Sequence, residues 1–292
     1  MSTARGVPVA VSGRAERGRG VSLLPSAVTV LALCLGVSSI KFALDGQPGA
    51  SYALIAAAAV LDALDGRIAR LLDVSSRIGA ELDSLADAVS FGVSPAIVLY
   101  LTVLEGSRGG WVVALVFLVC TVLRLARYNT LIDDDNAPPY AKEFFTGVPS
   151  PSGAMVSLLP LAVFLQFGDG WWTSAPLVAL WVLGDAALVI SRLHTLSVNS
   201  IQVPSRYAAP FLVLVGAVIA GLIVYPYLVV VGLTLVYLAH LPLATRRWRW
   251  LAAHPEVWDA APAQRKAVRR RSQRRLGLRP PRVRRLAGRR RP

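Results

Sequence analysis

Apolar runs as long as a membrane-spanning helix limit the fold of this chain more than any other feature. A helix needs roughly 20 predominantly apolar residues to cross the hydrocarbon core of a bilayer. Hydrophobic residues make up 54% of the 292 residues and charged residues only 16%, which is too apolar for a soluble globular protein. The runs are continuous rather than alternating, which argues against a membrane β-barrel. The sequence therefore predicts an all-α, multi-pass helical membrane protein.

We expect about eight transmembrane helices. Their approximate ranges are 23–44, 51–65, 80–104, 111–127, 152–167, 175–191, 208–224 and 228–243. Pro25 suits the first turn of the first helix. The backbone N–H that a proline lacks would have no hydrogen-bond partner at that position. No clear cleavage site follows this run, so it is predicted to be a retained helix rather than a removed signal peptide. Residues 66–78 are then a basic loop.

Charge divides the chain into three parts. Residues 1–22 are predicted to be a disordered basic segment, residues 23–243 the transmembrane domain, and residues 244–292 a basic cytoplasmic tail. From Arg246 onward the sequence holds 17 of the 31 Lys and Arg residues, so the net charge of +14 is mainly a property of the tail. Such a tail favours contact with anionic lipid over nucleic-acid binding, and we expect no nucleic acid as a partner.

The remaining basic residues predict the orientation in the membrane. With eight spans, 12 of the 14 Lys and Arg residues before the tail fall on the side of the N-terminus. The positive-inside rule then places both termini in the cytoplasm, as expected for a protein of the cell membrane. The two cysteines, Cys34 and Cys120, lie within apolar runs and lack metal-ligand spacing,.

Four carboxylates stand where apolar sequence tolerates them least. Asp62 and Asp65 share one helical face, as do Asp83 and Asp87,. If the two helices face each other, the four carboxylates form one pocket, which is stable only when cations neutralise it. Carboxylate oxygens favour Mg²⁺, Mn²⁺ or Ca²⁺ over zinc. An aspartate-lined cation transporter is an alternative of a different class, and Asp185, inside another apolar run, stays unexplained.

The spacing of this stretch carries a family resemblance. It reads Asp62-x2-Asp65-Gly66-x2-Ala69-Arg70-x8-Gly79-x3-Asp83-x3-Asp87. It resembles the signature of the CDP-alcohol phosphotransferase family at every fixed position. The resemblance implies a six-helix core, two divalent cations (Mg²⁺ or Mn²⁺), a homodimer, and an enzyme that transfers a phosphoalcohol from a CDP-linked donor to an acceptor hydroxyl with release of CMP.

The same resemblance implies roles for individual residues. Asp62, Asp65, Asp83 and Asp87 would bind the metals, and Asp87 would also accept the proton of the acceptor. The residues implied in binding the donor are Gly66, Arg70, Ser76, Gly79, Pro25, Ser26 and Ala27. A prenyl-diphosphate enzyme also binds metal through aspartates, but it would show a different spacing.

Three flanking stretches narrow the acceptor. Ser90-Phe91-Gly92-Val93-x-Pro95, Leu123 to Asn129, and Phe145 to Pro151 resemble the branch of the family that takes CDP-diacylglycerol as donor and serine as acceptor. One intramembrane arginine suits one carboxylate. We therefore expect Arg124 or Arg127 to pair with the serine carboxylate and Asn129 to hydrogen-bond nearby, although Arg127 fits equally well as a positive-inside anchor. Glycerol phosphate and inositol phosphate are the alternative acceptors within the family.

Overall fold

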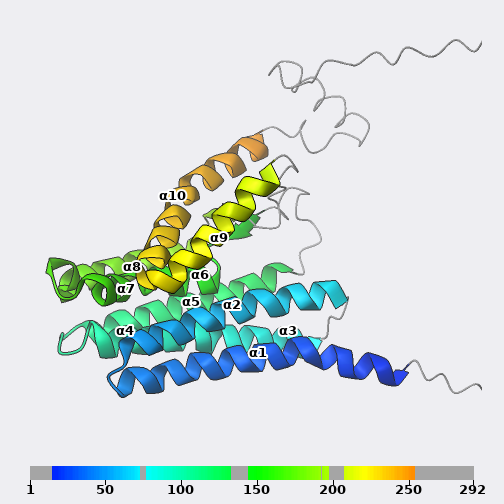
Figure 1. Ribbon diagram of the computed structural model, residues 1–292, viewed down its shortest axis with the longest axis horizontal. Coiled ribbons are helices and arrows are strands. Elements are labelled where there is room, and N and C mark those ends of the chain that lie inside the picture. The colour runs from blue at the N-terminus through cyan, green and yellow to red at the C-terminus, as the bar shows by residue number, and fades with distance from the viewer. Residues whose placement is uncertain (1–14, 73–76, 133–143, 192, 197–206, 254–292) are drawn as a thin grey trace, which may run out of the picture.

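The structure, a computed structural model, describes residues 15–72, 77–132, 144–191, 193–196 and 207–253. Long helices dominate it, and many of them run side by side along the longest axis (Figure 1). Two three-residue strands, β1 (Phe144–Thr146) and β2 (His194–Leu196), pair antiparallel. The prediction of a helical membrane protein is confirmed, with this small sheet as an addition.

The first half of the chain forms one side of the bundle. Its elements are α1 (Ala15–Leu44), α2 (Pro48–Leu72), α3 (Arg77–Asp87), the π-helix η1 (Ala88–Val93), α4 (Ser94–Thr102) and α5 (Gly110–Ile132). α1 packs along α2, and α3, η1 and α4 follow one another as a single helical path (Figure 1). The π-helix begins directly after Asp87, and such wide turns inside helices often occur at functional sites.

The second half adds the opposite side. Its elements are α6 (Ser150–Ser157), α7 (Leu159–Phe167), the 3₁₀-helix η3 (Trp171–Thr173), α8 (Ala175–Ile190), α9 (Ala208–Val224) and α10 (Pro226–Ala253). α6 and α7 are bent by 42° relative to each other, next to Pro160, a residue that interrupts helical hydrogen bonding,. α5 packs against α8, whereas α10 packs against α7 and β2.

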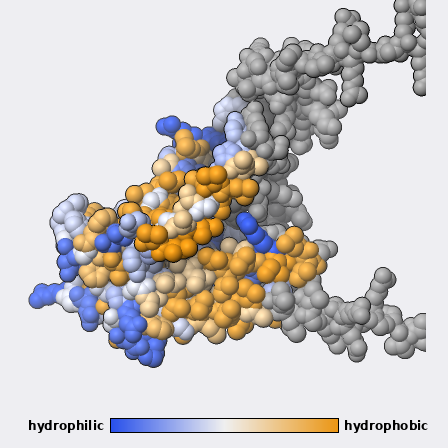
Figure 2. All heavy atoms as spheres, viewed as in Figure 1, coloured by the Kyte–Doolittle hydropathy of each residue, from blue (hydrophilic) through white to orange (hydrophobic). Residues whose placement is uncertain are grey.

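Hydrophobic side chains cover the outside of the bundle, as a bilayer requires. Figure 2 shows them over α1, α2, α9 and α10, with hydrophilic residues gathered at the end where α1 joins α2. Within the described residues, the segments long and apolar enough to cross a membrane are Pro25–Leu44, Ile78–Thr102, Gly110–Thr130 and Pro226–Trp250, and the bent pair α6–α7 can supply a fifth. α8 and α9 are shorter apolar helices. All eight predicted segments are helical, while the number of spans stays a prediction.

The core lies where the two halves meet. Leu99 of α4, Phe117 of α5, Leu161 of α7 and Val182 of α8 are fully buried. Because lipid tails are as apolar as these side chains, their contribution comes from close packing rather than from leaving water.

A glycine lets α1 contact the π-helix closely. A Cβ added at Gly36 would lie 2.5 Å from Ser90 Oγ and 2.8 Å from Ser90 Cα. Ser90 Oγ also donates a 3.3 Å hydrogen bond to the carbonyl oxygen of Ala32 on α1. The segment that follows Asp87 is therefore fixed against the first helix.

Three predicted boundaries are wrong. α1 begins at Ala15, so Pro25 lies inside the helix and residues 15–22 of the predicted disordered segment are helical. α2 continues to Leu72 through Gly66, because the residues after this glycine are mostly good helix formers,. Within the expected loop 66–78, residues 66–72 and 77–78 are therefore helical, and residues 73–76 lie outside the described ranges. α10 likewise runs into the predicted tail as far as Ala253.

Candidate functional site

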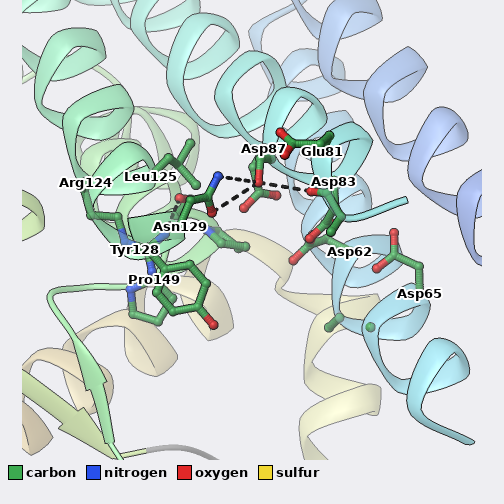
Figure 3. Close-up of a pocket in the computed structure, with 16 residues that line it drawn as sticks. Asp62, Asp65, Glu81, Asp83, Asp87, Arg124, Leu125, Tyr128, Asn129 and Pro149 are labelled. Carbon is green, nitrogen blue, oxygen red and sulfur yellow. Dashed lines mark hydrogen bonds between the residues drawn. The ribbon is translucent and has the colours of Figure 1, made fainter. Parts of the chain in front are cut away.

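A cavity of about 760 Å³ lies among α2, α3, α5 and the start of α6, and Figure 3 shows it in close-up. One side carries carboxylates, and the other side carries residues of α5 and the proline-rich segment after β1. The lining residues are Asp62, Ala63, Asp65, Gly66, Ala80, Glu81, Asp83, Ser84, Asp87, Arg124, Leu125, Tyr128, Asn129, Pro149, Ser150 and Pro151.

Three of the four predicted carboxylates converge in this cavity. Asp62 of α2 and Asp83 and Asp87 of α3 each offer an oxygen atom, and these three atoms lie within 4.8 Å of one another. Asp83 and Asp87 are one turn apart on α3, and α2 brings Asp62 opposite them (Figure 3). Like charges this close repel one another. The cluster therefore needs a cation or protons to be stable.

Asp65 stands apart from these three groups, although it lines the same cavity. Its side chain is only 4% exposed. Oδ2 of Asp65 accepts a 2.8 Å hydrogen bond from Thr29 Oγ1 on α1. A neighbouring helix thereby fixes the orientation of this carboxylate.

The predicted donor-binding residues are only partly placed at the cavity. Gly66 lines it, and Gly79 lies on α3 outside the lining set. Residues 25–27 lie on α1, within about one turn of Thr29, and do not line it either. Arg70 lies on α2 one turn beyond Gly66, but its side chain and all of Ser76 are outside the described residues. Their roles stay predictions.

Arg124 is a buried cation beside the acidic cluster. It is 5% exposed, and Nη1 donates a 2.7 Å hydrogen bond to Ser150 Oγ. The Arg124 guanidinium carbon lies 5.3 Å from the centroid of the Tyr128 ring, a cation–π distance,. It lines the same cavity as Asp87. The cavity therefore presents negative charge on one side and a fixed positive charge on the other.

Asn129 connects the two sides of the cavity at its rim. The side-chain nitrogen Nδ2 donates a 3.0 Å hydrogen bond to Ser84 Oγ on α3 (Figure 3). Because Ser84 follows Asp83, this bond ties α5 to the helix that carries two of the carboxylates.

Arg127 is engaged elsewhere and does not line the cavity. Nη1 and Nη2 donate to the carbonyl oxygens of Ile190 (2.8 Å) and Ser191 (2.9 Å), at the C-terminal end of α8. A cation there compensates the partial negative charge of the helix end. Gly147 (φ +81°) lies against this cap, since an added Cβ would approach Arg127 Nη2 to 3.3 Å and the Val189 carbonyl oxygen to 2.9 Å. These contacts favour a structural role for Arg127 at the end of α8 over binding of the acceptor.

Sequence reasoning missed five polar residues of the site: Thr29, Glu81, Ser84, Tyr128 and Ser150. Glu81 lies between Gly79 and Asp83, at a position that the family signature leaves open. Tyr128 and Ser150 lie within the stretches that carried the family resemblance, so their position was a usable signal. Thr29 and Ser84 gave none, because single hydroxyl residues within helices are common and their partners are distant in sequence.

The site defines a class before any comparison is made. Clustered carboxylates opposite a buried arginine, at one end of a membrane helix bundle, suit an enzyme that acts on a phosphorylated substrate with the aid of cations. The family model for CDP-alcohol phosphatidyltransferases matches residues 22–183, and a second one, CDP-alcohol phosphatidyltransferase 2, matches residues 206–242. The chain belongs to the CDP-alcohol phosphatidyltransferase family.

Two curated mycobacterial relatives share most of the chain, and a third, more distant one shares about half. A CDP-diacylglycerol–serine O-phosphatidyltransferase of Mycobacterium tuberculosis is 51% identical over 277 residues, which is 92% of this chain and 97% of the relative. The protein of the same name from Mycobacterium leprae is 49% identical over 261 residues, 89% of this chain and 87% of the relative. One from Helicobacter pylori is 38% identical over 138 residues, 47% of this chain and 56% of the relative.

Proposed function

We propose that this protein is a CDP-diacylglycerol–serine O-phosphatidyltransferase, which makes phosphatidylserine and CMP from CDP-diacylglycerol and L-serine. The observation that carries the proposal is the cavity in which Asp62, Asp83 and Asp87 converge opposite the buried Arg124. The two mycobacterial relatives, similar along nearly their whole length, bear this name.

The oxygen atoms that the cavity offers as metal ligands fit two divalent cations, Mg²⁺ or Mn²⁺. All are carboxylate oxygens, the ligands that hard cations prefer, and Asp62, Asp65, Asp83 and Asp87 would hold them. When bound, such cations neutralise phosphate oxygens and stabilise the charge that develops on the leaving group.

The residues of the chain supply the base. Asp87 takes the proton from the serine hydroxyl, whose oxygen forms a new bond to the phosphorus on the diacylglycerol side. The bond from that phosphorus to the CMP oxygen breaks, and CMP leaves. The serine side chains that line the cavity, Ser84 and Ser150, are hydrogen-bonded to Asn129 and Arg124, which supports direct transfer without a covalent enzyme intermediate.

The acceptor needs a cation for its carboxylate, and Arg124 provides one. Its guanidinium lies within the cavity lining, and the planar fork of an arginine matches a carboxylate,. Asn129 is at the rim, within the same lining. Glycerol phosphate or inositol phosphate would instead need several basic residues around a phosphate.

An apolar groove next to the cavity suits the acyl chains of the donor. It measures about 790 Å³, lies among α2, α6, α9 and α10, and shares Ala63 and Pro151 with the acidic cavity. A lipid whose diphosphate lies at the carboxylates can therefore keep its chains in the groove.

The location of the protein follows from the same proposal. The charge distribution supports insertion in the cell membrane with both termini in the cytoplasm,, where soluble serine reaches the cavity. The family resemblance supports a homodimer, which cross-linking in native membranes would test.

Incorporation of radiolabelled serine tests the proposed function. Purified protein with CDP-diacylglycerol and a divalent cation should convert labelled serine into a chloroform-soluble product. Labelled glycerol phosphate and inositol phosphate should not be incorporated; incorporation of one of these in place of serine would assign the protein to another branch of the family. Metal-dependent ion flux without lipid product would instead support the transporter.

A further inference from the structure

Three buried polar groups close to the cavity lack hydrogen-bond partners within the described part of the chain. They are Nε of Arg124, the hydroxyl of Tyr237 and both carboxylate oxygens of Asp185. They come from three different helices, α5, α10 and α8. Buried polar groups are seldom left unpaired, because the loss of water is then not offset. Each of the three therefore calls for an explanation.

Asp185 is the most exceptional of these groups. It is 2% exposed and is the sole charged residue of α8. It lines a cavity of about 330 Å³ together with Trp181 and Leu238, the neighbour of Tyr237 in sequence. The Trp181 indole nitrogen is already committed, since it donates to the carbonyl oxygen of Val156 at 2.8 Å. The Asp185 carboxylate therefore needs a hydrogen-bond donor from another helix.

Tyr237 of α10 lies near the surroundings of both other groups. It lines the apolar groove together with Ser152 of α6, two residues after Ser150, the hydrogen-bond partner of Arg124. It also packs against the buried cluster that contains Val189, one turn after Asp185 on α8. Tyr237 is therefore the residue of α10 that is placed to link the buried carboxylate with the arginine of the cavity.

The hydrogen-bonding capacities of the three groups complement one another. The Nε–H of an arginine can only donate, a phenol can accept one bond and donate another, and a carboxylate accepts. A chain from Arg124 Nε–H to the Tyr237 oxygen, and from the Tyr237 hydroxyl to Asp185, would satisfy all three.

We propose that Tyr237 and Asp185 are positioning residues, which hold Arg124 through this chain so that its two Nη groups face the acceptor. The bond from Arg124 Nη1 to Ser150 fixes the guanidinium at one point, and a bond at Nε fixes it at a second.

The proposal gives α8 and α10 a part in serine binding, although neither helix carries a predicted site residue. It rests on the proposed function, since its readout is the KM for serine. Asp185 lies just beyond the family match that ends at residue 183, so that match does not supply the role.

Kinetics of three variants test the inference: Tyr237→Phe, Asp185→Asn and, as a matched control, Tyr52→Phe. The Tyr52 hydroxyl is also buried without a partner, but it lies on α2 against the Tyr227 ring, 5.9 Å between centroids, and outside the cavity lining. Loss of one buried hydrogen bond to a charged group should raise the KM for serine about tenfold in the first two variants, with the KM for CDP-diacylglycerol changed less than about twofold. Tyr52→Phe should leave both constants unchanged.

A double variant provides the second measurement. If the two residues act through one chain, Tyr237→Phe/Asp185→Asn should raise the KM for serine no further than the more severe single variant. Additive effects, equal changes in both KM values, or an unchanged KM for serine in Tyr237→Phe would overturn the inference. If Asp185→Asn does not fold, the comparison of Tyr237→Phe with Tyr52→Phe decides. Failure of the proposed function would differ, because the unaltered protein would then incorporate no serine.

Discussion

Thr29 of α1 donates a 2.8 Å hydrogen bond from Oγ1 to Oδ2 of Asp65 on α2. The same hydroxyl lies 3.1 Å from the carbonyl oxygen of Pro25. The bond explains why Asp65 is held apart from the three converging carboxylates. The bond also makes α1 a part of the site, to which α1 contributes a hydroxyl group and not a carboxylate.

Thr29→Val should weaken the response to divalent cation. Valine has nearly the shape of threonine but lacks the hydroxyl, so the Asp65 carboxylate loses its fixed orientation. Loss of such a supporting hydrogen bond typically lowers metal affinity about 10- to 100-fold. Titration of activity with Mg²⁺ or Mn²⁺ measures the change. Thr29→Ser keeps the donor and should behave like the unaltered protein; equal behaviour of Val and Ser at this position would contradict the role.

Asp87→Asn should abolish turnover while preserving the fold. The amide is nearly isosteric but cannot take the proton from serine, and the loss of a general base costs about 10²- to 10⁴-fold in kcat. Asp169→Asn is the matched control, since Asp169 is exposed and lies between α7 and η3, outside the cavity lining. Labelled-serine incorporation and thermal unfolding in detergent are measured for both. Near-normal activity of Asp87→Asn would exclude Asp87 as the base.

Arg124→Ala should raise the KM for serine far more than the KM for CDP-diacylglycerol. Truncating one partner of a buried charge pair costs about 2–5 kcal/mol, so an increase of at least about 30-fold is expected for serine. Steady-state kinetics with each substrate varied in turn provide the two constants. Unchanged serine kinetics would remove Arg124 from the acceptor site.

Arg127→Ala should reduce stability rather than serine binding. Its guanidinium bonds the last carbonyl oxygens of α8, and loss of such a cap costs about 1 kcal/mol. Thermal unfolding in detergent should show a lower Tm, and the KM for serine should stay the same. A raised KM for serine with unchanged Tm would instead return Arg127 to the acceptor site.

Helical spacing made the acidic cluster predictable. Asp83 and Asp87, one turn apart, must share a face of α3, and the family motif implied that α2 would face them. Spacing could not separate Asp65 from its neighbours, because the separation depends on Thr29, 36 positions earlier in the chain. Contacts between helices that are distant in sequence determine the position of Asp65, which the local spacing does not specify.

The two arginines of α5 illustrate the same limit. Arg124 and Arg127 are three residues apart, and both suited the acceptor from sequence alone. The orientation of α5 against α6 and α8 turns the first toward Ser150 and the second toward the end of α8. The loop expected at 66–78 differs from the structure for another reason: a glycine such as Gly66 often ends a helix, whereas here the residues around it support a continuous helix as far as Leu72,.

The acidic cavity and the apolar groove adjoin each other, and this arrangement gives phosphatidylserine and CMP different exit routes. Ala63 and Pro151 border both spaces. Phosphatidylserine made at this junction can diffuse sideways among neighbouring lipids, whereas CMP can leave only into water. The products thus part into different phases, just as the substrates come from different phases, CDP-diacylglycerol from the bilayer and serine from water. The arrangement of two adjoining chambers therefore joins a lipid path to an aqueous path and delivers each new lipid directly to the leaflet that the cavity faces.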